Sequence, residues 1–523
     1  ATVAANAWQQ FTALVTGSTN KAVTWKVNGI TGGNTTVGVI TTGGNYRAPQ
    51  YVPTMSVTVS AVSNADSTKQ GNAAITVTGA PPPSPTPTPT PMPSPSPSPS
   101  PSPMPTPTPM PSPSPSPSPS PSPSPVPTPP PADAQTVAAG RLLEQTTFGP
   151  TTALIDHVKQ IGAQAWLDEQ FNTPESVWPN GVNSTHDELR NGLYDHYLNG
   201  QDQLRQRVVH TLSEIIVIGW SKNNYPNMVV PWLQILSRNA FGNYKTLLRE
   251  ITLDASMGNY LDMVNSTKPS ASGGANENYA REVMQLFSIG LYELNPDGSF
   301  KLDSNGKQIP TYTMNDVRQI ALALTGWTYN NTTPPVTLNG NYYPGQMYPL
   351  PAYHDTSSKT FLGRTLPANQ TMQKDVDDVV ETLFNHPNIA PFIAVRMIRG
   401  LVTSNPSPAY IARVAAVFND NGLGVRGDLK AVIRAILLDP EARNDTPTAT
   451  SGRLKEPILH ISQFLRALDG RYSSTEQLTY LYDYMAQMPL SPPSVFSWFS
   501  PLYHVPKSPL FGPEFQIYSP TEA

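Results

Sequence analysis

The sequence contains no cysteine and little charge. Without cysteine the chain has no disulfide framework, no thiolate metal site and no cysteine nucleophile, and this suits an oxidising environment outside the cell. Charged residues make up 13% of the sequence, against about 25% in an ordinary soluble domain. Lysine and arginine number 33 and aspartate and glutamate 37, which gives a net charge of -4. Because no basic excess is available to hold a polyanion, we expect no nucleic-acid partner.

Long apolar runs are missing as well. No stretch reaches the roughly 20 apolar residues that span a bilayer, so we expect no membrane-spanning segment. The opening residues, ATVAANAWQQF, lack the basic start and apolar middle of a signal peptide. We therefore expect that a signal was removed or that the sequence begins after one. Asn, Thr, Ser, Gly and Pro fill the place of the missing charges, as is common in bacterial proteins that are secreted or sit on the cell surface, and we expect that location.

The composition changes twice along the 523 residues, which are too many for one hydrophobic core. Residues 1–80 alternate apolar and polar side chains, as at Val23, Trp25 and Val27, between turns rich in glycine and asparagine. This period of two predicts short antiparallel strands in a small all-β sandwich, with Trp25 and Tyr46 in its core.

Residues 81–132 are a Pro/Ser/Thr-rich linker built from Ser-Pro and Thr-Pro repeats. Alternate prolines remove backbone donors and fix φ, so the segment cannot form helix or sheet, and we expect a disordered linker of polyproline II type. Linkers of this kind join the domains of extracellular polysaccharide-degrading enzymes and also lift domains off cell surfaces.

Residues 133–523 carry apolar side chains at helical spacing in most of their segments, which predicts a large, mainly α-helical domain. One exception is Ser299–Ile309, where Asp303–Gly306 has the composition of a hairpin turn. We expect loops and irregular structure in residues 330–371.

The run AVTWKVNGITGGNTTVGVITTGGNYRAP, residues 22–49, resembles bacterial immunoglobulin-like group 2 domains. The resemblance implies an immunoglobulin-like sandwich that acts as a spacer or an adhesive module. In that family a further strand precedes the position where this sequence begins, so we expect the sandwich to be truncated at its N-terminus.

Seven blocks after the linker resemble, in order, the bacterial family called domain of unknown function 1800. They include RLLEQTTFGPT from Arg141, NENYAREVMQLFSIGLYEL from Asn276 and HDTSSKTFLG from His354. The resemblance implies an exported helical protein but no particular reaction. The sequence departs from the family pattern at Gln285, where an acidic residue is common. It also departs at the C-terminus, where members continue into another helix, so we expect truncation there. The expected fold is thus multidomain: an immunoglobulin-like sandwich, a linker and a large helical domain.

The stretch NENYAREVMQLFSIG holds the densest cluster of ionisable and amide side chains. On a helix Glu277 faces Arg281 and Asn278 faces Glu282, while apolar residues form another side. Such a helix lies against a core and presents a ridge of hydrogen-bonding groups. Asn276, Asn278 and Arg281 are therefore candidates for binding substrate, and so is Asp262 in the segment NYLDMVNS.

Glu277 and Glu282 are candidate catalytic carboxylates for hydrolysis of a glycosidic bond, which needs two carboxyl groups about 5 to 9.5 Å apart. Five helical residues turn them about 140° apart, so Asp262 or Asp355 would be a better partner for either glutamate. The alternative is structural: the two side-chain pairs form a buried network that ties the helix to the Asp262–Asn265 turn.

His354 and Asp355 are the other candidate catalytic residues, and Lys359, four residues further on, is a candidate for binding an anionic part of the substrate. They lie in a predicted loop, where functional groups concentrate, and histidine can act as a base. His210 and Glu214 stand one helical turn apart, but without the full zinc-binding motif we interpret them as structural.

We expect no cofactor and no metal site. Two turns, Asn295–Gly298 and Asp303–Gly306, offer oxygens suited to calcium. Both lack the bidentate glutamate that closes a calcium loop, so calcium is only a weak alternative to ordinary turn chemistry.

Two functions of different classes follow. The first is a secreted hydrolase, glycoside-type, that acts on extracellular polysaccharide. The second is a non-catalytic cell-surface or matrix protein that binds a partner and uses its immunoglobulin-like domain as spacer or adhesive module. The sequence does not indicate an oligomeric state.

Overall fold

The computed structural model divides the chain into two compact units. It describes residues 1–78 and 133–517 apart from short gaps at 6, 35–36, 50–51, 54–55, 179–184, 221, 224–225, 271–272, 331–336, 339, 341, 447 and 471–484. The linker predicted at 81–132 lies outside the described residues.

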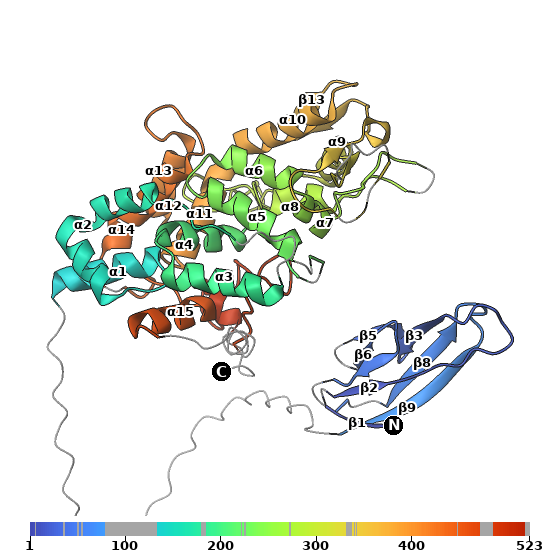
Figure 1. The fold of residues 1–523 in the computed structure, drawn as a ribbon. Coiled ribbons are helices and arrows are strands. Elements are labelled where there is room, and N and C mark those ends of the chain that lie inside the picture. The colour runs from blue at the N-terminus through green and yellow to red at the C-terminus, as the bar shows by residue number, and fades with distance from the viewer. Residues whose placement is uncertain are drawn as a thin grey trace, which may run out of the picture. The chain divides into compact units, whose positions relative to one another are not determined.

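The N-terminal unit is built of two β-sheets (Figure 1). Its strands are β1 (Thr2–Ala4), β2 (Trp8–Gln10), β3 (Val23–Val27), β4 (Ile30–Thr31), β5 (Gly33–Asn34), β6 (Gly38–Ile40), β7 (Asn45–Arg47), β8 (Val57–Ser63) and β9 (Gln70–Thr78). One sheet has the order β1-β9-β8-β3-β4 and the other β2-β7-β6-β5. The β1–β9 pair is parallel and the remaining pairs are antiparallel.

The two sheets share one hydrophobic core. Trp25 and Val27 of β3 and Tyr46 of β7 are buried in it, as the alternating pattern predicts. The Tyr46 hydroxyl donates a 2.7 Å hydrogen bond to the carbonyl of Val37, which satisfies its polar end inside the core. The all-β prediction for this region is confirmed.

The C-terminal unit is mainly helical, as predicted. Its helices are α1 (Ala134–Thr146), α2 (Thr152–Asn172), α3 (His186–Asn199), α4 (Gln203–Ser213), α5 (Pro226–Asn239), α6 (Tyr244–Leu253), α7 (Ala255–Tyr260), α8 (Asn278–Gln285), α9 (Met314–Ala323), α10 (Met372–Asn385), α11 (Ile389–Leu401), α12 (Pro408–Asn419), α13 (Leu429–Leu438), α14 (Pro440–Arg443) and α15 (Pro457–Ala467). Figure 1 shows α1, α2 and α13 gathered at one end of this unit and α9 and α10 at the other.

Local sequence explains where many of these helices begin. The side chain of Ser407 accepts a hydrogen bond from the N–H of Tyr410, and Pro408 takes the first position of α12. Asp428 caps α13 and Asn243 caps α6 in the same way. The apolar faces of the helices then pack into one core.

Short strands and turns fill the connections between helices. They include β10 (Trp327–Thr328) with β11 (Tyr348–Pro349) and β12 (Lys359–Phe361) with β13 (Arg364–Leu366). Two 3-10 turns are η1 (Pro351–Tyr353) and η2 (Pro513–Gln516). The predicted turn at Asp303–Gly306 is present, because the N–H of Gly306 donates to the carbonyl of Asp303 at 3.0 Å.

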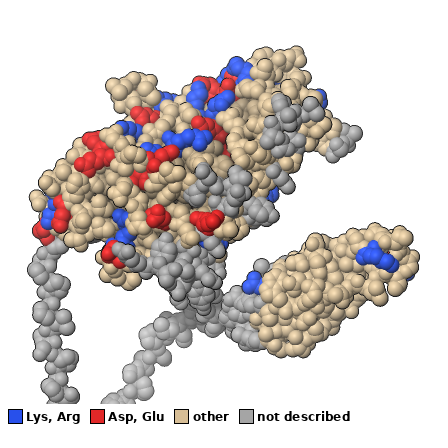
Figure 2. Space-filling view, in the orientation of Figure 1, with Lys and Arg blue, Asp and Glu red and all other residues tan. Residues whose placement is uncertain are grey.

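Acidic and basic side chains interleave over the face of the helical unit that Figure 2 shows, without a broad area of one sign. This distribution matches the small net charge of the chain. Among the described residues, no helix is both long enough and apolar enough to cross a membrane.

Candidate functional site

The amide and acidic residues of the stretch around α8 form several separate interactions and do not gather at one site. The side chain of Asn276 accepts a 2.9 Å hydrogen bond from the N–H of Asn278 at the start of α8. Glu277 forms ion pairs with Arg281 at 3.3 Å and with Arg318 of α9 at 3.5 Å. About a third of the Glu277 side chain is exposed, so this ion-pair group lies at the surface.

Asn278 and Glu282, predicted to face each other, form no hydrogen bond with each other among the described contacts. Asn278 donates a 3.1 Å hydrogen bond to Asp262, which also forms an ion pair with Lys222. Glu282 is 7% exposed, and burial raises its pKa. Its Oε2 has no hydrogen-bond partner among the described residues. The helix is therefore tied to the Asp262 turn by Asn278, and Glu282 stands apart from that contact.

His354, Asp355 and Lys359 meet in a buried group that includes Asp375 of α10. The Nδ1 atom of His354 is hydrogen-bonded to Thr325. Its Nε2 atom lies 3.2 Å from the carboxylate of Asp375. The Lys359 ammonium lies 3.0 Å from Asp375 and 3.4 Å from Asp355. Burial works to raise the pKa of Asp375, but its close contacts with His354, Gln370 and Lys359 hold it below its usual value.

A short segment connects these two groups. The hydroxyl of Ser266 accepts from the N–H of Asn276 at 3.0 Å, and its carbonyl accepts from Gly326 at 2.8 Å, next to Thr325 and His354. One cleft of the helical unit is lined by Gln285 at the end of α8, but by none of the predicted site residues.

This cleft has a volume of about 500 Å³. Its walls come from five places: residues 285–294, the 297–300 turn, α11, the start of α12 and residues 496–511. Large apolar side chains lie half-exposed around it, among them Leu291, Tyr292, Phe300, Phe496 and Leu502. Gly290, at φ 72°, allows close packing here, because a Cβ would come 2.8 Å from the ring of Phe392.

Two arginines of α11 also line this cleft. Arg396 donates to the backbone carbonyl of Glu214 at 3.0 Å. Arg399 donates to the carbonyls of Ser404 at 3.1 Å and Pro501 at 3.0 Å. No carboxylate of the described residues lies within ion-pair distance of either guanidinium.

A second, much smaller cavity of about 40 Å³ adjoins the cleft and shares Arg396, Arg399 and Pro501 with it. Glu214 and Glu514 line this cavity from the other side. The volume suits one or two water molecules, since a water needs roughly 10–15 Å³.

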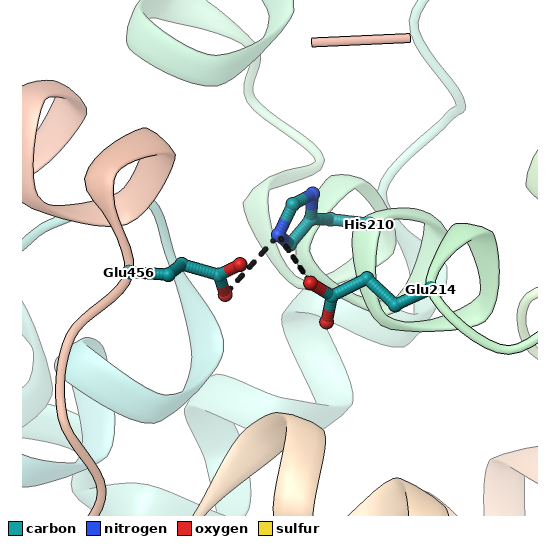
Figure 3. Close-up of side chains that lie close together, drawn as sticks. All are labelled: His210, Glu214 and Glu456. Atoms are coloured by element: carbon teal, nitrogen blue, oxygen red, sulfur yellow. Dashed lines mark ion pairs between the residues drawn. The ribbon is translucent and has the colours of Figure 1, made fainter. Parts of the chain in front are cut away.

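Behind this cavity lies a buried cluster of His210, Glu214 and Glu456 (Figure 3). His210 and Glu214 project from the end of α4, and Glu456 directly precedes α15. The Nε2 atom of His210 lies 3.3 Å from Glu456 and 3.9 Å from Glu214. Figure 3 shows the imidazole between the two carboxyl groups.

The two glutamates of this cluster differ in protonation. Burial, and then the charge of Glu456, raise the pKa of Glu214 well above its usual value. Burial also opposes ionisation of Glu456, but His210 and Arg453 lower its pKa well below the usual value. Burial lowers the pKa of His210. These shifts favour the protonated form of Glu214 and the ionised form of Glu456.

The same three residues offer ligand atoms within 4.8 Å of one another, close enough for a divalent cation. The surroundings favour a shared proton instead. Glu456 already accepts hydrogen bonds from Arg453 at 2.9 Å and from Gln487 at 2.5 Å. The buried guanidinium of Arg207 adds a second positive charge beside the cluster. A divalent cation would add further positive charge to a site whose carboxylates are already neutralised.

The sequence interpretation overlooked most of this region. It noted His210 and Glu214 as one helical turn but assigned them a structural role, and it did not consider Glu456, Arg396 or Arg399. One usable signal was present: two arginines three residues apart in the otherwise apolar helix IAPFIAVRMIRGL. A buried helix rarely carries unpaired charge without a reason.

Fold and cleft together define a helical domain with an apolar cleft that ends at two arginines. The family described as protein of unknown function DUF1800 matches residues 141–510. The match covers well over half of the chain, and the chain belongs to this family. No curated protein and no solved structure matches the chain.

Proposed function

We propose that this is a secreted or cell-surface protein whose helical domain binds a small apolar ligand in the 500 Å³ cleft. The observation that carries the proposal is the ring of half-exposed aromatic and leucine side chains around the cleft. Single chains rarely leave such apolar patches open unless the patches bind something. The volume also lies in the usual range of about 300–1,000 Å³ for a site that encloses one small molecule.

The N-terminal unit fits this proposal as an immunoglobulin-like spacer or adhesive module. Its two sheets around Trp25 support the immunoglobulin-like assignment, and the composition of residues 81–132 supports a linker that separates the two units. The absence of cysteine is compatible with a location outside the cell, where a free thiol would be oxidised.

Calorimetric titration of the full chain with decan-1-ol tests this function. We expect saturable binding, weakened by Phe496→Ser, because Phe496 lines the cleft and is 41% exposed. Phe464→Ser is the matched control, because Phe464 is 61% exposed on α15 and does not line the cleft. Absence of binding, or equal weakening in both variants, would contradict the proposal.

A second candidate is a hydrolase that acts on extracellular polysaccharide. The observation that favours it is the pair of Glu214 and Glu456, whose pKa values are pushed in opposite directions beside the cleft, as in an acid and base pair. In this case Glu214 would donate the proton to the leaving group.

Turnover of a panel of neutral and acidic polysaccharides tests the hydrolase. We expect Glu214→Gln to lower kcat by about 100-fold or more, as for loss of a general acid. Parallel variants Glu277→Gln, Glu282→Gln and His354→Ala test the residues predicted from sequence. Absence of turnover by the unmodified protein would remove the hydrolase from consideration, and turnover that stays unchanged in all four variants would exclude these residues as its catalytic groups.

A further inference from the structure

The cleft is lined by two guanidinium groups that have no ion-pair partner within 4.0 Å among the described residues; Glu214 and Glu514 act on them only from beyond that distance, across the small adjoining cavity. Arg396 and Arg399 stand three residues apart on α11, and both line the cleft. Their hydrogen bonds go to the backbone carbonyls of Glu214, Ser404 and Pro501. Carbonyl groups orient the guanidinium groups but carry no net charge, so both arginines keep their charge and unused N–H donors.

The two guanidinium groups also act against each other. Burial lowers the pKa of Arg396 to about 10 against the opposing charge of Glu214. Burial and then the charge of Arg396 lower the pKa of Arg399 to about 10, against the opposing charge of Glu514. Both remain protonated at neutral pH. An anion placed between them would relieve the repulsion and replace the water that burial has removed.

We propose that the ligand of the cleft is an amphipathic anion, whose apolar chain occupies the cleft and whose carboxylate or similar group is held by Arg396 and Arg399. This inference rests on the proposed function and names the ligand class of the same cleft.

The walls of the cleft favour an apolar chain over an acidic sugar. Leucine, phenylalanine, proline and valine side chains make up most of the lining, and few polar groups face the hydroxyls that a sugar would bring. Among those few, Asn405 is already engaged by its hydrogen bonds to the backbone of Phe511. Arg399 itself lies over the Phe511 ring at 4.0 Å, so charge and apolar surface adjoin.

Three ligands with the same ten-carbon chain test the inference on the unmodified full chain at pH 7: decanoate, decan-1-ol and decylammonium. We expect decanoate to bind about tenfold or more tightly than decan-1-ol, as a charge-assisted hydrogen bond would give. Decylammonium should bind most weakly of the three, because the arginines repel it.

Substitutions test whether Arg396 and Arg399 cause the preference for decanoate over decan-1-ol. Arg396→Gln and Arg399→Gln should each remove most of the preference for decanoate over decan-1-ol, and leave the affinity for decan-1-ol within about twofold. Arg249→Gln is the matched control, because Arg249 pairs with Asp377 and does not line the cleft. Thermal melting by circular dichroism identifies any variant that fails to fold, and the three-ligand comparison on the unmodified chain does not depend on the variants.

The outcomes separate the inference from the function on which it rests. Equal affinity for decanoate and decan-1-ol overturns the inference but leaves the apolar site intact. Failure of both to bind overturns the proposed function. Binding of tetragalacturonate that decanoate does not displace overturns the inference in favour of an acidic glycan. A dimer in light scattering that closes the cleft to decanoate overturns it in favour of a second copy of the chain.

Discussion

At the scale of single residues, the buried cluster around Glu456 shows how burial and charge divide two identical side chains. Glu456 is fully buried but stays ionised, because Arg453 donates to it at 2.9 Å and His210 lies 3.3 Å away. Glu214, close by, has no comparable donor and holds a proton. Substitution of the charged member, Glu456, should therefore cost more stability than substitution of the neutral member, Glu214.

We therefore predict opposite effects for two like substitutions. Glu456→Gln should lower the free energy of unfolding at pH 7 by about 3 kcal/mol, because it removes one of the two carboxylates that pair with the buried Arg453 and leaves only Glu514. Glu214→Gln should raise it or leave it unchanged, because glutamine is neutral in both states, whereas at pH 7 Glu214 takes up a proton on folding. Denaturant unfolding at fixed pH measures both. Equal losses in the two variants would contradict the assigned protonation states.

The pH dependence follows from the same assignment. The raised pKa of Glu214 contributes stability that is present below the unfolded value of 4.5 and is lost as pH rises through the folded pKa. The free energy of unfolding of the Glu214→Gln variant should therefore increase relative to that of the unmodified protein as pH rises above 4.5. The lowered pKa of Glu456 contributes stability that is present above 4.5 and is lost as pH falls. If the difference in free energy of unfolding between the Glu214→Gln variant and the unmodified protein did not vary with pH, the raised pKa of Glu214 would be contradicted.

At the scale of elements, the contact between α4 and α11 places the cluster beside the cleft. α4 carries His210 and Glu214, while α11 carries Arg396 and Arg399. The two helices approach closely at Gly400 of α11, where a Cβ would overlap the methyl group of Thr211. The carbonyl of Gly400 also accepts hydrogen bonds from Arg207 and Arg453, so this glycine couples helix packing to the cluster.

Gly400→Ala should accordingly destabilise the helical unit, although alanine is the better helix former. We expect a loss of about 1–3 kcal/mol from overpacking. Gly140→Ala on α1 is the control, because nothing lies within 4 Å of its added Cβ, and there we expect a gain of about 0.5–1 kcal/mol. Urea unfolding of both variants measures the difference, and a gain in both would show that α4 and α11 can move apart freely.

Helix periodicity predicts the mainly helical character of residues 133–523, but three of the helices carry little periodic signal: α3, α7 and α14. α3 has a low apolar content, and the stronger signal at its start is a capping box formed by Thr185 and Glu188. α7 and α14 are too short for a periodic pattern to emerge. At α8 the pairing of Glu277 with Arg281 follows from helical spacing, whereas Asn278 turns to Asp262 on another segment.

At the scale of the whole molecule, two units have separate hydrophobic cores. Val27 is fully buried in the core of the β unit, and Val208 of α4 is fully buried in that of the helical unit. Because neither core includes residues of the other unit, the stability of one should not depend on packing in the other.

Scanning calorimetry of the full chain should therefore resolve two transitions. Val27→Ala should lower the Tm of one transition, and Val208→Ala that of the other, each through a loss of roughly 1–3 kcal/mol. If either substitution shifted both transitions together, the units would be energetically coupled and the predicted role of residues 81–132 as a separating linker would be wrong.

The sequence by itself determined the two kinds of unit, the class of each and the ends of many helices. These properties depend on neighbours within a few residues, through periodicity, capping and proline content. Only the tertiary structure decided which charged groups meet. His210 and Glu456 come together from α4 and the start of α15, and the cleft gathers walls from residues 285 to 511. Burial and charge at such sites arise from packing between distant segments, and local sequence carries no record of that packing.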